Sequence, residues 1–310
     1  MRIGILGAES LGVRGLSCVV ETADRLIVID PGLALGYQRY GLLPHPVQVA
    51  VGEQVRRQIR GALEDATDIV VSHYHGDHVP LPDANPYQLR VADVATSFRR
   101  VRLWTKGPSG LSPNMIHRRA MLGGALNREL PNVEGESDGP LTFSPAVPHG
   151  EPGTHLGTVM MTRIEDAGTV FVHASDIQLL DAQAVSVILA WQPDIVVVGG
   201  PPLYLTALSS IQRKRAREEA ERLAQGVDTL ILDHHLLRCQ EGLSWLGHLA
   251  AQSNHEVLCA ADYMGRPRCL LEARRAELYR KMPVPEGWHA AYARGETDTQ
   301  AYQHYCRRCL

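Results

Sequence analysis

An apolar segment that ends in a crowd of metal-binding side chains is the strongest constraint on the fold. Residues 67–80 read TDIVVSHYHGDHVP. The isoleucine–valine run predicts a short buried β-strand, and His73, His75, Asp77 and His78 follow it closely. A set of imidazoles and a carboxylate without cysteine suits Zn²⁺, Fe or Mn²⁺ and argues against a closed structural zinc site. The segment therefore predicts one part of a metal centre at a strand end, rather than a zinc clip or a chance surface cluster.

The rest of the chain repeats one unit, which is an apolar strand, a polar ligand-type residue at its end, and often a helix. RLIVID ends at Asp30, GTVFVHASD ends at Asp176, and TLILDHH ends at His234 and His235. In α/β sheets, sites form beyond the carboxyl ends of the strands. Helical periodicity is present at 47–64, 178–190 and 211–225. We therefore expect an α/β protein in which other strand ends complete the metal centre.

Each of the remaining candidate ligands has an alternative role. His149 follows a predicted strand in the motif PHG, but it can also be a hydrogen-bonded loop histidine. A carboxylate such as Asp176 can bridge two cations, or it can cap the helix that follows it. For His234 and His235 we expect one metal ligand and one neighbour that supports the site or packs beside it.

Composition limits the class of protein. The chain has 310 residues and a net charge of -3, so it carries no global signal for nucleic acid or an anionic membrane. We find no signal peptide and no apolar run of the ~18 residues that a membrane span needs. Six scattered cysteines favour reduced thiols, and we expect a cytoplasmic protein. The terminal HYCRRCL, with Cys306 and Cys309, is a weak zinc signal, and surface thiols are the favoured interpretation.

The motif SHYHGDH, with DPG upstream and isolated His, Asp and His downstream, resembles the metallo-β-lactamase superfamily. ESLGVRGLSCVVET, IDPGLALGYQRYGLLPHP, LDHHLLR and YMGRPRCLLEARRAELY are similar to an uncharacterised, mostly archaeal family of predicted metallo-hydrolases within it. The resemblance implies an αββα sandwich, with two mixed β-sheets flanked by helices, over residues 1–281 and an irregular C-terminal extension over 282–310. Members of that family continue the Asp176 motif with Gly-Pro, whereas this chain has Gln178-Leu179-Leu180, which leaves the shape of that loop open.

The resemblance also implies two divalent metal ions, with zinc the first choice and Fe or Mn²⁺ the alternatives. The implied ligands are His73, His75 and His149 for the first ion, then Asp77, His78 and one of His234 and His235 for the second, with Asp176 between the ions. Asp30 would support the ligand loop by hydrogen bonds without binding metal, which orients the imidazoles. Asp77 would in addition be the catalytic residue, because it would orient the nucleophile or accept its proton.

The implied reaction is hydrolysis of a small ester, lactone or phosphoester by a metal-activated hydroxide. The alternatives are a nuclease or nucleic-acid phosphodiesterase of the same fold and a non-catalytic metal-binding or interaction protein. Arg118 and Arg119 fit either an anionic small-molecule substrate or a solvated helix face, while nucleic acid and membrane are disfavoured as partners. Tyr74 and His117 could assist a leaving group, although packing and a surface loop are the favoured roles.

Overall fold

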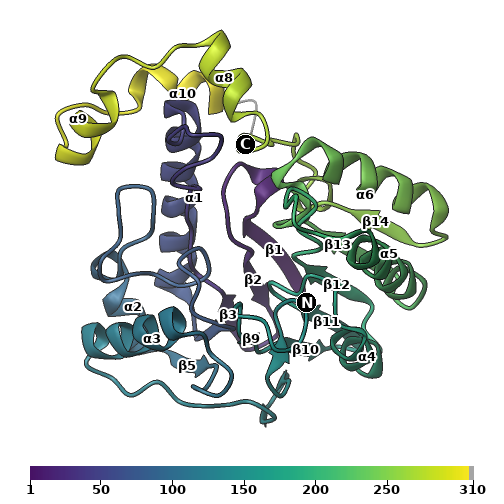
Figure 1. Cartoon of the computed structure of the whole chain (residues 1–310). Helices are drawn as coiled ribbons and strands as arrows, with labels where there is room; N and C mark the ends of the chain where they lie inside the picture. The colour runs from purple at the N-terminus through teal and green to yellow at the C-terminus, as the bar shows by residue number, and fades with distance from the viewer. Residues whose placement is uncertain (307–310) are drawn as a thin grey trace.

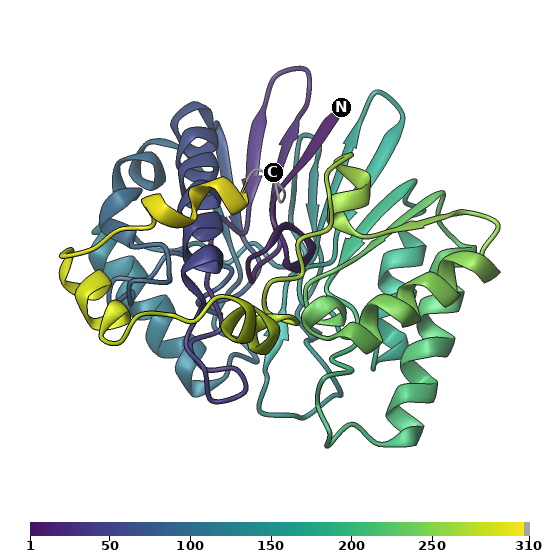
Figure 2. The same cartoon turned by 90° about the horizontal axis from the view of Figure 1, so that it is seen from above.

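The computed structural model describes residues 1–306 and has two mixed β-sheets packed face to face between helices (Figures 1 and 2). The first sheet has the order β1-β2-β3-β4-β5. Its strands are β1 Arg2–Gly7, β2 Ser17–Glu21, β3 Leu26–Ile29, β4 Asp68–Val71 and β5 Arg102–Thr105. The hairpin β2–β3 is antiparallel, whereas β3, β4 and β5 run parallel. The parallel strands therefore present their carboxyl ends at one edge of the sheet.

The second sheet has the order β14-β13-β12-β11-β10-β7-β6. Its strands are β6 Ser137–Asp138, β7 Leu141–Phe143, β10 Thr162–Asp166, β11 Thr169–His173, β12 Ile195–Val198, β13 Thr229–Leu232 and β14 Glu256–Leu258. Strands β11 to β14 are parallel, and β10 is antiparallel to both of its neighbours. The short strands β8 Val147–Pro148 and β9 Thr158–Val159 form a separate two-stranded sheet. This arrangement confirms the αββα sandwich with two mixed sheets that the resemblance implies.

Alternating side chains of β4 contribute to two different cores. All four residues of the strand are buried, which confirms the strand expected at TDIVVSH. Val70 belongs to the apolar cluster between the sheets, whereas Ile69 and Val71 belong to the cluster beneath the helices. Because successive side chains of a strand point to opposite faces, one short apolar run fixes this strand on both sides. Burying each such side chain contributes about 1.5–3 kcal/mol, so the ligand loop after β4 starts from a rigid base.

Helices cover the outer face of each sheet (Figure 2). The first sheet carries α1 Pro46–Asp65, α2 Ala95–Arg100 and α3 Pro113–Leu126, and the second carries α4 Ala182–Ala190, α5 Ser210–Gln225 and α6 Gln240–Gln252. In α1 the apolar face is buried, and Pro46 occupies the first turn, where its missing N–H costs nothing. Among residues 1–306, no helix is long and apolar enough to cross a membrane.

The helix expected over 178–190 begins later, at Ala182. The side chain of Asp181 accepts hydrogen bonds from the backbone N–H groups of Gln183 and Ala184, so Asp181 is the N-cap. The alternative role of Asp176 as this cap is therefore wrong. In the loop between them Leu179 has a φ of 58°, a left-handed conformation that glycine adopts more easily.

Short helices occupy much of the chain beyond residue 274. They are α8 Arg275–Lys281, α9 Trp288–Arg294 and α10 Gln303–Cys306, with a 3-10 turn at Gln300–Tyr302. Before them the chain forms the short helix α7 Ala260–Tyr263 and 3-10 turns at Glu9–Leu11, Val91–Asp93 and Leu236–Arg238. The extension expected to be irregular from residue 282 thus contains helical turns, and Figure 1 shows it over one end of α1. Thr299 Oγ1 donates to Glu53 Oε2 of α1 at 2.6 Å. The boundary at residue 281 stays a prediction.

Two cysteines differ from the expectations. Cys306 is buried against α1 and is not a surface thiol, while Cys309 lies outside the described residues. Cys269 is disulfide-bonded, so the expectation of reduced thiols fails at that position. Cys18, Cys239, Cys259 and Cys306 are free.

Candidate metal centre

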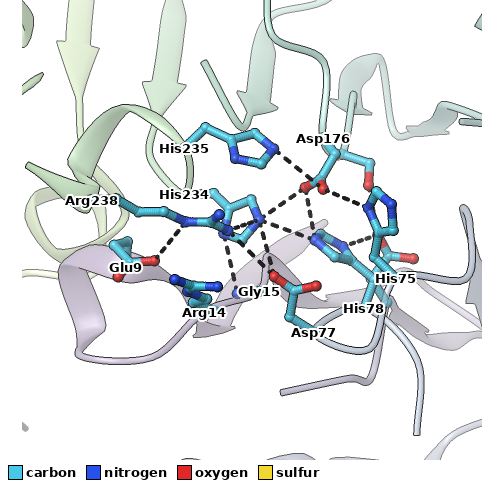
Figure 3. A network of polar contacts seen from close by, with 12 residues as sticks. Glu9, Arg14, Gly15, His75, Asp77, His78, Asp176, His234, His235 and Arg238 are labelled. Atoms are coloured by element: carbon cyan, nitrogen blue, oxygen red, sulfur yellow. Dashed lines mark hydrogen bonds and ion pairs between the residues drawn. The ribbon is translucent and has the colours of Figure 1, made fainter. Parts of the chain in front are cut away.

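The candidate ligands lie on loops that follow the ends of strands. Figure 3 shows that the side chains of His75, His78, His234 and His235 gather around Asp176. His73 to His78 follow β4, and His149 follows β8. Asp176 follows β11, and the pair His234 and His235 follows β13. Strands β4 and β13 end in the buried apolar residues Val71 and Leu232, and β11 ends in the buried His173, so each of these loops leaves the core at a fixed point. The structure therefore brings together every residue that the sequence nominated as a ligand.

The carboxylate of Asp176 lies at the centre of six imidazole rings. Its Oδ1 lies 2.7 Å from His78 Nε2 and 3.1 Å from His234 Nε2. Its Oδ2 lies 3.3 Å from His149 Nε2, 3.4 Å from His73 Nε2, 3.4 Å from His235 Nε2 and 3.5 Å from His75 Nδ1. Each carboxylate oxygen thus faces its own group of nitrogen atoms, as a carboxylate between two cations would.

The pair His234 and His235 divides between the two groups. His234 Nε2 lies 3.6 Å from Asp77 Oδ2 and 3.3 Å from His78 Nε2, on the side expected for the second metal ion. His235 Nε2 lies 3.1 Å from His149 Nε2, on the side of the first. Both rings turn a nitrogen atom towards Asp176. His234 therefore lies with the second group of candidate ligands, and His235 lies beside the first.

The donor set fits divalent cations. The nitrogen atoms His73 Nε2 and His75 Nδ1 are 3.0 Å apart. Burial, with help from the charge of His78, lowers the pKa of His73 to about 3, and a neutral imidazole is the form that binds metal. Oδ1 of Asp176 is buried and accepts no hydrogen bond of acceptable geometry from residues 1–306, although His78 is close. Crowded nitrogen lone pairs and a buried carboxylate oxygen of this kind are what a metal ion would satisfy.

Access to the site is from the side of His75 and Asp77. Their side chains are 25% and 17% exposed, whereas His73 and His78 are fully buried. Burial alone raises the pKa of Asp77, but His78, His234 and Arg238 together lower it well below its ordinary value. The residue nominated as catalytic is therefore a partly exposed carboxylate on the more exposed side of the site.

Asp30 supports the ligand loop through four hydrogen bonds. Its carboxylate accepts from the N–H of Ser72 at 2.8 Å, from Ser72 Oγ at 2.6 Å and from Ser175 Oγ at 2.8 Å. Its Oδ2 also lies 2.9 Å from His78 Nδ1. A donor at Nδ1 leaves Nε2 of His78 free for a metal ion. The contacts agree with the supporting role expected for Asp30, which stays a prediction until it is tested.

These contacts predict a pH dependence of stability for the metal-free protein. Burial raises the pKa of Asp30, but the hydrogen bond and charge of His78 outweigh it, so that the pKa falls from 3.8 to about 2. A carboxyl group with a lowered folded pKa stabilises the protein above its unfolded pKa, and this contribution disappears as the pH falls through the folded value. We expect the free energy of unfolding of the wild type, relative to Asp30→Asn, to fall by about 2 kcal/mol between about pH 5 and about pH 2. Urea unfolding measures both proteins, and a constant difference would contradict the prediction.

Two residues that shape the site, Asp233 and Arg238, were not among the candidates from the sequence. Asp233 accepts hydrogen bonds from the N–H groups of Ser10, His234 and Ala260, so it fixes the histidine pair as Asp30 fixes the first loop. Its place directly before His234 at a strand end was the available signal. Arg238, in the turn after the histidine pair, contacts Asp77 and His234. No local sequence pattern predicted these contacts.

The remaining candidates lie away from the reacting groups. Tyr74 is fully buried and donates to the carbonyl oxygen of Lys106 at 2.7 Å, so it packs as favoured. His117 is exposed on α3 rather than in a loop. Arg118 donates to the carbonyl oxygen of Tyr74 at 3.4 Å, and Arg119 donates to that of Lys106 at 3.5 Å. The guanidinium groups of these arginines therefore contact backbone carbonyl oxygens and not the side chains of the candidate ligands.

Two facing mixed sheets with a histidine–aspartate cluster at their edge are similar to the metallo-β-lactamase superfamily, and the model of that superfamily matches residues 12–79. The chain is 51% identical over 302 residues to a UPF0282 protein of Methanosarcina mazei, covering 97% of this chain and 99% of that one. The chain belongs to the UPF0282 family.

Solved structures show more distant likeness. The structure of CmlA, a diiron beta-hydroxylase from Streptomyces venezuelae, has a TM-score of 0.49 at 13% identity, over 83% of this chain and 52% of that chain. Tm1679, described as a metal-dependent hydrolase of the beta-lactamase superfamily, has a TM-score of 0.46 at 13% identity, over 83% of this chain and 94% of that chain. The fold implies divalent metal ions, and the histidine–aspartate groups are the candidate ligands.

Proposed function

We propose that the protein is a dinuclear metal-dependent hydrolase of a small ester, lactone or phosphoester. The observation that carries this proposal is the carboxylate of Asp176, whose two oxygens face two separate groups of imidazole nitrogens. A structural zinc clip would need a single closed set of ligands. A carboxylate shared between two groups instead favours two ions with an open face, on the side of His75 and Asp77.

Each group would hold one ion. The first would be held by His73, His75, His149 and Asp176, with His235 as a further neighbour, and the second by Asp77, His78, His234 and Asp176. When bound, such ions lower the pKa of a shared water molecule towards about 7 and neutralise negative charge on the substrate. Asp77, as the accessible carboxylate, would orient the attacking water by accepting a hydrogen bond. Asp30 and Asp233 would keep the rings in place through their hydrogen bonds to the two loops.

A small substrate is favoured over nucleic acid. Arg118 and Arg119, the basic pair on α3, direct donors to backbone carbonyl oxygens. The net charge of -3 also gives no electrostatic attraction to a polyanion as a whole. A non-catalytic role is disfavoured because both groups of candidate ligands, and the carboxylates that support them, are present together.

Metal analysis coupled to a substrate panel tests this proposal. Protein purified without added metal is expected to hold about two ions per chain, with zinc, iron or manganese identified directly, and to hydrolyse at least one of a lactone, a thioester and a phosphodiester. His75→Ala should lose at least about a hundredfold in activity, because it removes a ligand where the loss of a supporting residue alone costs about 10–100-fold. The matched control is His117→Ala on the exposed face of α3. Fewer than one ion per chain, or equal loss in the control, would overturn the proposal.

A further inference from the structure

Arg238 is a buried guanidinium that points into the candidate metal centre from the side of the second group (Figure 3). It ends the 3-10 turn Leu236–Arg238, directly after the histidine pair. Its Nη2 lies 2.8 Å from His234 Nε2 and 3.3 Å from Asp77 Oδ2. Among residues 1–306 we find no other arginine with a hydrogen bond to the side chain of a candidate ligand. A permanent cation has thus been placed where a divalent ion would also bind.

The other two nitrogen atoms of this guanidinium have partners outside the candidate metal centre. Nη1 donates to the hydroxyl group of Tyr204 at 3.1 Å, and Nε lies 3.4 Å from Glu9 Oε2. The guanidinium also stacks against the ring of Tyr204, at 5.7 Å from its centroid. Arg39 packs on the same tyrosine ring and donates to the backbone oxygen of Arg238 at 3.2 Å. These contacts fix the planar fork, so Nη2 is the part of it that is directed at the site.

The partners of Nη2 are atoms that a second metal ion would need. A cation that takes the lone pairs of Asp77 Oδ2 and His234 Nε2 would leave the N–H groups of Nη2 without acceptors in a buried place. Unpaired buried donors are costly. The positively charged guanidinium would also repel the two metal ions. An anionic oxygen between them would satisfy both. The neighbouring Arg14 is engaged elsewhere, since its Nε donates to Glu272 at 2.7 Å.

We propose that Arg238 binds an anionic oxygen of the substrate, so that this site takes substrates carrying a phosphoester or a carboxylate group. The inference rests on the proposed dinuclear site and adds to it the charge of the substrate and the residue that recognises it. It assigns to Arg238 the anion contact for which the sequence had offered Arg118 and Arg119. Tyr204 and Glu9 are positioning residues, because they act through Arg238.

Calorimetric titration of the Co²⁺-loaded protein with inorganic phosphate tests the inference without measuring activity. We expect the wild type to bind phosphate and Arg238→Met to bind it at least about tenfold more weakly, as the loss of a charge-assisted hydrogen bond implies. Co²⁺ content should be unchanged. The control variant Arg118→Met, which removes an arginine that contacts only the ligand-loop backbone, should keep the wild-type affinity. A parallel titration with acetate distinguishes the sources, because tighter binding of phosphate indicates a phosphoester and tighter binding of acetate a carboxylate.

A second variant guards against misfolding of Arg238→Met. Tyr204→Phe removes only the hydroxyl group that holds Nη1, and the expected loss of phosphate affinity is about two- to tenfold. Wild-type affinity in both variants, an equal loss in Arg118→Met, or binding of neither anion by the Co²⁺-loaded wild type would overturn the inference while leaving the dinuclear site intact. A wild type that takes up no Co²⁺ would instead overturn the proposed function and this inference together.

Discussion

Asp176→Ala should abolish the dinuclear site while leaving the fold intact. The carboxylate is the single group that faces all six rings, with each oxygen directed to a different group. Loss of a residue that only supports a ligand weakens metal binding by about 10–100-fold, so loss of the shared carboxylate should cost at least about a hundredfold. We expect metal content after dialysis to fall to one ion per chain or fewer, and hydrolysis to fall with it.

The matched control for this prediction lies five residues along the same loop. Asp181 caps α4 through the N–H groups of Gln183 and Ala184. Asp181→Ala should therefore lower the free energy of unfolding by about 1 kcal/mol and leave the metal content unchanged. Elemental analysis and urea unfolding of both variants separate the two roles. Retention of two ions by Asp176→Ala would show that this carboxylate is not shared between them.

Gly32→Ala should be among the most destabilising single substitutions in this chain. A Cβ atom at Gly32 would lie 2.2 Å from His78 C and 2.2 Å from Val79 N. Those atoms belong to the backbone of the ligand loop, which cannot move aside as a flexible side chain can. Overpacking a core typically costs about 1–3 kcal/mol, and a clash with fixed backbone should cost at least about 3 kcal/mol. We expect metal affinity to fall as well, because relief of the clash displaces His78.

Gly61→Ala provides the contrast. Gly61 lies inside α1, and a Cβ atom there would meet nothing within 4 Å. Alanine in a helix interior is favoured over glycine by about 0.5–1 kcal/mol, so this variant should be slightly more stable than the wild type. Urea unfolding and Co²⁺ titration measure both variants. If Gly32→Ala were as stable as Gly61→Ala, the close approach of the DPG turn to the ligand loop would be wrong.

Much of the fold could be predicted because it depends on local patterns. The isoleucine–valine run before His73 predicts a strand that is buried on both faces. The helical spacing of apolar residues in α1 predicts the face that this helix buries. The start of α4 was harder, because the loop 177–181 is apolar enough to resemble a helix. There Leu179 takes a left-handed conformation and Asp181 supplies the cap, and such local backbone geometry leaves little trace in hydrophobic periodicity.

The sequence by itself determined which groups this protein can offer to a metal ion, because ligand chemistry belongs to the residue types, and strand ends bring them to one edge. Only the tertiary structure decided how they divide. His234 and His235 are neighbours in the chain, yet each turns towards a different oxygen of Asp176. Arg238 reaches Asp77 across 161 positions of sequence. Such contacts depend on how two sheets pack against each other, and no short segment of the chain contains that information.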